Sequence, residues 1–156
     1  MIKTIKIDGQ SFNLDDINCI YSGSNYMGVN IDANCEQAQE YGSIYSLNKS
    51  KHSPKEMGLT LAQNGIHNFA SITQKGDLLV NLEKVSASSS QSSELNLSTL
   101  EKKGELSLSF SDGTAHVFQL FDSYLDAQSA KSALDSAISF YWKSSNSDDC
   151  LDFDGK

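Results

Sequence analysis

Apolar and polar residues alternate over several short stretches of the chain, which is the pattern of strands that bury one face. Ile5 and Ile7 alternate with lysine, an Asp-Gly pair follows, and Phe12 and Leu14 continue the alternation. This arrangement predicts an N-terminal β-hairpin. Later stretches of the same kind predict further strands at 17–21, 26–31, 43–47 and 78–85, and a short helix is expected at 34–41.

Residues 53–70 fit two incompatible structures. Ser53 and Glu56 have the spacing of a capping box, and an Asn-Gly pair follows where a helix of some ten residues would end. However, Leu59 and Leu61 alternate with polar residues, and Asn-Gly is also a strong hairpin turn. We favour the hairpin, because Gly58 inside a helix would cost about 1 kcal/mol.

The stretch LSLSFSDGTAHVFQL at 106–120 predicts a second hairpin whose register depends on its turn. A two-residue turn would leave Phe118 and Leu120 beside serines. A three-residue loop at 111–113, with Gly113 in the left-handed region, instead keeps the large apolar groups on one face. We therefore expect the three-residue loop. It places His116 and Phe118 opposite Leu108 and Leu106, so His116 should be a partly buried, neutral histidine on the apolar sheet face.

A long amphipathic helix is predicted for residues 123–143. Ser123 and Asp126 are spaced as in a capping box, and Lys143 suits the negative helix end. The helix carries an apolar stripe at 3.6-residue spacing, formed by Ala127, Ala130, Leu134, Ala137, Ile138 and Tyr141. We expect one domain over residues 1–143, a mobile serine-rich loop at 86–98, and a flexible acidic tail at 144–156.

These elements predict an α+β fold, with a strongly bent antiparallel sheet or partly open barrel packed by a C-terminal amphipathic helix. The segment from Leu106 to Trp142, in which SFSDGTAHVFQL runs directly into the last helix, resembles the close of a pleckstrin-homology-like fold. The resemblance implies a binding scaffold that presents loops or a sheet edge to lipids, peptides or proteins. Lipid-binding members use basic residues around the first strand pair. Here KTIKIDGQSF supplies Lys3 and Lys6 without arginine, which argues against phosphoinositide binding.

The charge balance argues against two classes of partner, nucleic acids and anionic membranes. All twelve basic residues are lysines, against twenty carboxylates, and the net charge is -8 at pH 7. A chain without arginine and with net negative charge lacks the electrostatic signature of a nucleic-acid binder, and it is repelled by anionic membranes. We interpret the acidity mainly as a solubility feature. The N-terminal MIKTIKIDGQ contains no signal-like apolar run, so we expect a cytoplasmic protein.

No local signature marks a catalytic, cofactor-binding or metal-binding residue. The residues that could supply a nucleophile or a base are three cysteines and three histidines: Cys19, Cys35, Cys150, His52, His67 and His116. The cysteines are odd in number and lack a C-x-x-C spacing, which favours reduced thiols over disulfides or zinc. DCLDFDGK at 149–156 is similar to a calcium loop, but its first ligand position, Cys150, is a cysteine and the distal glutamate is missing.

The sequence therefore favours a non-enzymatic interaction domain without a cofactor. We expect its partner to be another protein, held by a sheet edge or by loops. One alternative is an acidic inhibitor or immunity-type protein that masks a basic target, which would bind more weakly as salt rises. A second alternative is a small enzyme that brings a histidine and a carboxylate together in a cleft.

Overall fold

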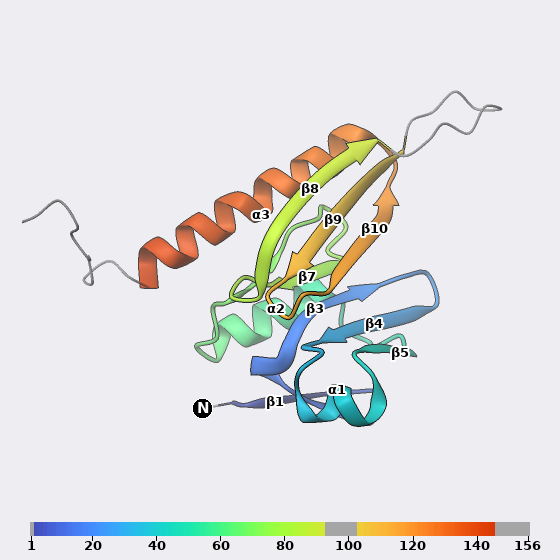
Figure 1. Ribbon diagram of the computed structural model, residues 1–156, viewed down its shortest axis with the longest axis vertical. Coiled ribbons are helices and arrows are strands. Elements are labelled where there is room, and N and C mark those ends of the chain that lie inside the picture. The colour runs from blue at the N-terminus through green and yellow to red at the C-terminus, as the bar shows by residue number, and fades with distance from the viewer. Residues whose placement is uncertain (1, 93–102, 146–156) are drawn as a thin grey trace, which may run out of the picture.

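The computed structural model describes residues 2–92 and 103–145, and it is an α+β fold with three antiparallel sheets and a long C-terminal helix (Figure 1). The predicted bent sheet packed by a helix is confirmed, and the strands do not close into a barrel in the described part of the chain. The elements are β1 (Thr4–Ile7), β2 (Gln10–Asn13), the short 3-10 helix η1 (Leu14–Asp16), β3 (Ile17–Ser22), β4 (Tyr26–Ile31), α1 (Glu36–Tyr41), β5 (Ile44–Asn48), α2 (Pro54–Gln63), β6 (Phe69–Ser71), β7 (Leu78–Asn81), β8 (Val85–Ser92), β9 (Gly104–Phe110), β10 (Ala115–Phe121) and α3 (Tyr124–Ser145).

The two larger sheets are stacked, and each is covered by a helix. The five-stranded sheet has the order β5-β4-β3-β7-β6, the three-stranded sheet has the order β10-β9-β8, and β1 and β2 form a separate hairpin. Helix α2 packs on β6, β7 and β3, whereas α3 runs along β8 and β9. None of the described helices is long and apolar enough to cross a membrane.

The central strands β3 and β7 are buried on both faces. Cys19 and Val80 belong to a core shared with the three-stranded sheet and α3. Ile20 and Leu79, the next residues in each strand, point the opposite way into a second core with the N-terminal hairpin and α2. Burial on both faces explains why apolar residues occupy consecutive positions in these strands and do not alternate with exposed polar ones.

The hairpin expected within residues 53–70 is wrong, because residues 54–63 form helix α2. Both halves of the capping box are made: Ser53 Oγ accepts from the Glu56 amide, and the Glu56 carboxylate accepts from the Ser53 amide. Gly58 allows the helix to approach the sheet, since a Cβ there would lie 2.7 Å from Leu79 Cδ1. Close packing on β7 therefore outweighs the poor helix propensity of glycine.

The mobile loop expected at 86–98 is also wrong for residues 86–92, which belong to β8. This strand pairs with β9 from Val85 to Ser92, so backbone hydrogen bonds order the serine-rich segment. Residues 93–98 lie outside the described residues. The flexible acidic tail expected at 144–156 is wrong for residues 144 and 145, which are the last residues of α3. Residues 146–156 lie outside the described residues.

The predicted register of the β9–β10 hairpin is confirmed. Gly113 has a φ of 89°, and Phe110 donates its amide to the Thr114 carbonyl at 2.8 Å, which closes the three-residue loop. His116 lies opposite Leu108 on the half-buried inner face of the sheet. The N-terminal hairpin and the short helix, with bounds 36–41, are confirmed as well.

Candidate functional site

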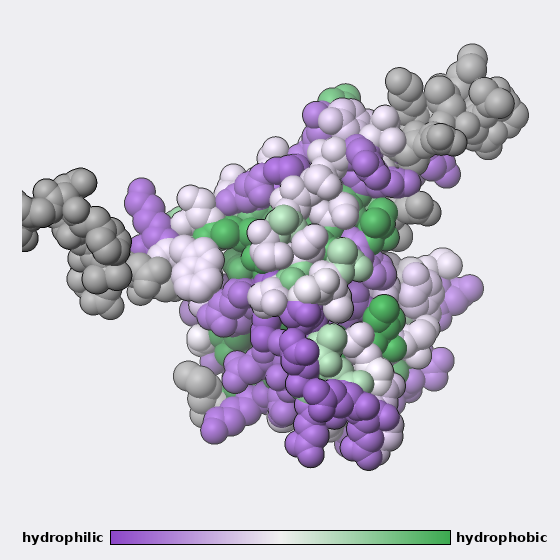
Figure 2. Space-filling view, in the orientation of Figure 1, coloured by the Kyte–Doolittle hydropathy of each residue, from purple (hydrophilic) through white to green (hydrophobic). Residues whose placement is uncertain are grey.

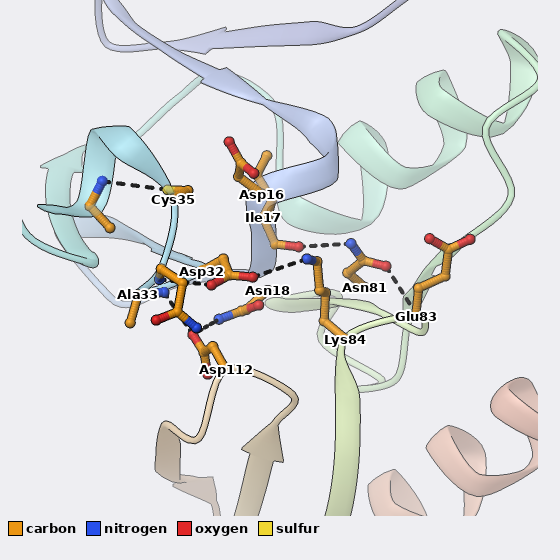
Figure 3. Close-up of polar contacts among 12 residues, drawn as sticks. Asp16, Ile17, Asn18, Asp32, Ala33, Cys35, Asn81, Glu83, Lys84 and Asp112 are labelled. Atoms are coloured by element: carbon orange, nitrogen blue, oxygen red, sulfur yellow. Dashed lines mark hydrogen bonds and ion pairs between the residues drawn. The ribbon is translucent and has the colours of Figure 1, made fainter.

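The junction between the two larger sheets is organised around Asp112, in the loop between β9 and β10 (Figure 3). Asp112 Oδ2 accepts from the Ala33 amide at 2.8 Å and from Asn18 Nδ2 at 3.1 Å. Its other oxygen accepts from the Thr114 amide at 2.9 Å and from the Thr114 hydroxyl at 2.6 Å. Burial acts to raise the pKa of Asp112, but these four hydrogen bonds outweigh it and the pKa is lowered. Asp112 is thus an ionised structural anchor.

A second set of polar contacts holds the other side of this junction. Lys84 Nζ pairs with Asp32 Oδ2 at 3.2 Å, and both side chains are largely shielded from solvent. Fully buried Asn81 donates to the Ile17 carbonyl at 2.8 Å and accepts from Asn68 Nδ2 at 2.9 Å. Each contact joins segments far apart in the sequence. Together they fix the connection between β7 and β8 relative to β3 and the end of β4.

Next to this junction, a chain of hydrogen bonds sets the tautomer of His116. The Tyr21 hydroxyl donates to Asn30 Oδ1 at 3.5 Å, so the amide nitrogen of Asn30 faces His116. Asn30 Nδ2 lies 3.4 Å from His116 Nδ1. An amide nitrogen can only donate, so Nδ1 accepts and the ring proton is on Nε2. His116 therefore presents an N–H donor for which the described residues supply no hydrogen-bond partner.

The imidazole of His116 is held rigidly between aromatic rings. Its centroid lies 4.4 Å from that of Phe118 and 5.2 Å from that of Tyr21. Burial alone lowers the pKa of His116 below its ordinary value near 6.5, so the ring is neutral at pH 7. The expectation of a partly buried, neutral histidine is confirmed.

His116 borders a pocket of about 290 Å³, which we call the seam pocket, between the start of β10, the end of β4 and the start of β5. Its lining consists of Asn30, Ile31, Ser43, Ile44, Phe110, Thr114, Ala115 and His116. Ile44 and Ala115 are exposed, so the pocket opens to solvent. None of the lining side chains is ionised at neutral pH, and the volume suits a side chain or a small group rather than a large cofactor.

The outer edge of β10 adjoins the seam pocket and pairs with no strand in the described part of the chain. Because Phe110 donates its amide to the Thr114 carbonyl, the alternation of an antiparallel ladder turns the N–H and C=O of Ala115 and Val117 outward. The strand AHVFQLF contains no lysine, carboxylate or proline, and Val117 is 46% exposed. Sheet edges are usually protected by charge or proline. This edge lacks both.

A larger groove of about 830 Å³ lies between the C-terminal half of α3, β6 and the N-terminal segment. His67 and Asp15 both line it, together with apolar groups such as Phe140, but no hydrogen bond or ion pair joins the two. Tyr141, also on its wall, donates its hydroxyl to the Glu83 carboxylate. The groove thus brings a histidine and a carboxylate into one depression, with no hydrogen bond between the two.

Among the described residues, no hydrogen bond or ion pair joins the remaining nucleophile and base candidates to one another. Cys19 is fully buried, and burial raises the pKa of its thiol strongly. Cys35 Sγ accepts from the Ala38 amide at 3.4 Å and thereby caps α1. His52 pairs with Glu56 at 3.3 Å, but both side chains are more than half exposed at the start of α2. Cys150 lies outside the described residues, as does the calcium-like sequence around it.

Comparison with known proteins adds no relatives: no protein-family model, no curated protein and no solved structure matches this chain. Within the described ranges, no group of three or more His, Cys, Asp or Glu side chains could hold a metal ion. The class that the fold defines is therefore a small α+β protein with antiparallel sheets. Its candidate site is the combination of the seam pocket and the β10 edge.

Sequence reasoning placed His116 correctly but missed the residues that organise the site. Asn18, Asn30 and Asn81 are each at most 6% exposed, and each interrupts a strand that is otherwise apolar. A buried amide needs partners, so an asparagine inside an apolar strand marks a place where two elements meet. That signal was present in INCIY, YMGVNI and LLVNL.

The lowered pKa of His116 predicts a pH dependence of stability. The unfolded chain binds this proton more tightly than the folded one, so the stability is complete above about pH 6.5 and falls as the pH drops toward the lowered folded value. We expect the free energy of unfolding, measured with urea, to decrease between pH 7 and pH 5. His116→Gln keeps an acceptor for Asn30 and cannot take up the proton, so it should reduce this slope. An unchanged slope in that variant would contradict the assignment.

Proposed function

We propose that this protein is a non-enzymatic interaction domain that binds an extended, uncharged segment of another protein as an additional strand along β10. The observation that carries the proposal is the unpaired and unprotected edge of that strand. Its outward N–H and C=O groups, at Ala115 and Val117, are the donors and acceptors that an incoming strand requires.

The surroundings of the edge support an uncharged partner segment. The outer face of the three-stranded sheet carries mainly serine, alanine and valine side chains, and Figure 2 shows a pale, weakly polar surface over β8–β10 while hydrophilic side chains gather over α1. A net charge of -8 repels acidic segments at longer range. The partner segment is thus uncharged where it pairs and neutral or basic in its flanks.

Rigidity also favours binding at this edge. The hairpin that carries β10 is fixed at its loop by the four hydrogen bonds of Asp112, and its inner face is packed through Phe118. A strand that is already ordered loses little further conformational entropy when a partner strand is added.

The proposal is tested with a displayed library of random linear peptides, selected against the full chain. Val117→Pro removes the outward N–H of residue 117 without removing a bond of the β9–β10 ladder. We expect selected peptides to bind this variant at least about tenfold more weakly than the wild type, the loss of roughly one backbone hydrogen bond. Hydrogen exchange of the Ala115 and Val117 amides should slow when peptide binds.

Ser90→Pro is the matched control, because the same alternation places the amide of Ser90 at the free edge of β8. Peptides that pair with β10 should bind this variant as they bind the wild type. Equal binding to Val117→Pro, or loss of binding to Ser90→Pro alone, would refute strand addition at β10. A concentration-dependent dimer without peptide binding would assign the edge to a second copy of this chain instead.

A further inference from the structure

The seam pocket has a chemistry that the β10 edge alone does not specify. The edge offers backbone groups, which do not distinguish one side chain from another. The pocket offers a shaped cavity with the polar side chains of Asn30, Ser43, Thr114 and His116 in its lining. What the pocket accepts would therefore decide which segments bind. This inference rests on the proposed strand addition.

The geometry of an added strand directs one partner side chain toward the seam pocket. His116 uses its backbone groups toward Leu108 on β9, so toward an incoming strand it occupies a non-hydrogen-bonded position. At such positions the side chains of directly opposite residues are closest and lie on the same face of the sheet. The partner residue opposite His116 therefore projects beside the imidazole on the inner face, where the seam pocket lies.

The free ring nitrogen of His116 is a donor. Tyr21 and Asn30 are 8% and 6% exposed. In both hydrogen bonds the donor lies on the Tyr21 side: Tyr21 donates to Asn30, and Asn30 donates to His116. The chain ends at His116 Nε2–H. A ligand atom that meets this nitrogen must accept a hydrogen bond.

The rest of the lining excludes a charged group. Ile31, Ile44 and Phe110 supply apolar walls, and no lining residue carries a charge that could pair with a buried ammonium or carboxylate. The lining residue Thr114 is hydrogen-bonded to the carboxylate of Asp112, and both oxygens of that carboxylate already accept hydrogen bonds. We infer that the seam pocket receives an uncharged partner side chain that ends in an oxygen acceptor, with the amides of glutamine and asparagine as the best fit.

Capped amino acids test this inference without a known partner. The probes are N-acetyl-glutamine N-methylamide, its norleucine counterpart of similar length, and the corresponding glutamate and lysine compounds, each titrated into the full ¹⁵N-labelled chain. We expect saturable NMR shifts at Ile44, Ala115 and His116, with the glutamine probe binding at least about tenfold more tightly than the other three, which corresponds to one hydrogen bond.

The His116→Phe variant separates the hydrogen bond from the shape of the pocket. It keeps a ring between Tyr21 and Phe118 but has no donor, so the glutamine and norleucine probes should bind it equally. Long-range ¹⁵N spectra of the wild-type imidazole need no variant and should show the proton on Nε2. A proton on Nδ1, tighter binding of lysine or glutamate, or no preference for glutamine would each overturn the inference.

The test of the seam pocket can fail independently of the test of strand addition. Capped single residues cannot add a strand, so their binding reports on the pocket alone. Library peptides that require the β10 edge but show no glutamine or asparagine opposite His116 would overturn the pocket chemistry and leave strand addition standing. If the glutamine probe binds at His116 but the library peptides bind Val117→Pro as well as the wild type, strand addition is overturned and the pocket chemistry stands.

Discussion

Asp112→Ala should lower the free energy of unfolding by about 3 kcal/mol, because it leaves several buried polar groups without partners at once. Asn18 is 1% exposed, and its Oδ1 already has no hydrogen-bond partner. Loss of the carboxylate would leave its Nδ2 unpaired as well, along with the Ala33 amide. Urea denaturation at pH 7 measures the effect.

Two controls make the Asp112 result specific. Asp112→Asn keeps one accepting oxygen and should lose clearly less stability than the alanine variant. Asp135→Ala removes contacts of an exposed carboxylate on α3 and should cost under about 1 kcal/mol. If all three variants were equally stable, the junction would not depend on Asp112.

The lowered pKa of Asp112 predicts how the stability loss of Asp112→Ala changes with pH. A carboxylate whose folded pKa lies below its ordinary value near 3.8 contributes stability that is complete above that value and is lost as the pH falls through the folded pKa. The difference in unfolding free energy between the wild type and Asp112→Ala should therefore shrink below about pH 3.8. A constant difference would contradict the hydrogen-bond pattern.

Gly28→Ala should also destabilise the fold, by about 2–3 kcal/mol, through overpacking of a buried sheet position. Gly28 lies directly opposite Tyr21 in the β3–β4 ladder, and the ring of Tyr21 covers it. A Cβ at residue 28 would lie 2.1 Å from Tyr21 Cζ, so the ring must move. That movement also breaks its hydrogen bond to Asn30.

A double-mutant cycle isolates the Gly28 clash. In a Tyr21→Ala background, Gly28→Ala should cost much less than in the wild type, because the ring that it displaces is absent. Ser46→Ala changes the exposed residue opposite Gly28 on β5 and should be nearly neutral. The Gly28→Ala variant should also shift the imidazole resonances of His116. Strictly additive costs in the cycle would argue against direct contact as the cause.

The sequence predicted those parts of the fold whose local and tertiary preferences agree. The β9–β10 hairpin is the clearest example, since its loop, its register and the face of His116 all followed from keeping Phe118 with Leu106. The stripe on α3 was equally informative, because Ala127 and Leu134 are fully buried. In each segment the spacing of apolar residues fits either a strand or a helix, but not both.

Prediction failed where tertiary packing decided between local alternatives. In α2, the alternation of Leu59 and Leu61 suggested a strand, yet Leu61 is buried and Leu59 is 57% exposed on a helix that packs against Leu79. In β8, pairing with β9 orders a serine-rich segment that has no apolar periodicity. The seam pocket combines residues from β4, β5 and β10, and no single stretch of sequence contains its geometry.

The burial of β3 and β7 on both faces has a consequence for how the protein unfolds. Ile20 belongs to one core and its neighbours Cys19 and Tyr21 to the other, so neither core can open without exposing a strand of its counterpart. The molecule should therefore lose both halves in one cooperative transition. Backbone amides of β3 and β7 should exchange with solvent only through global unfolding, and they should be the slowest-exchanging amides in the described chain.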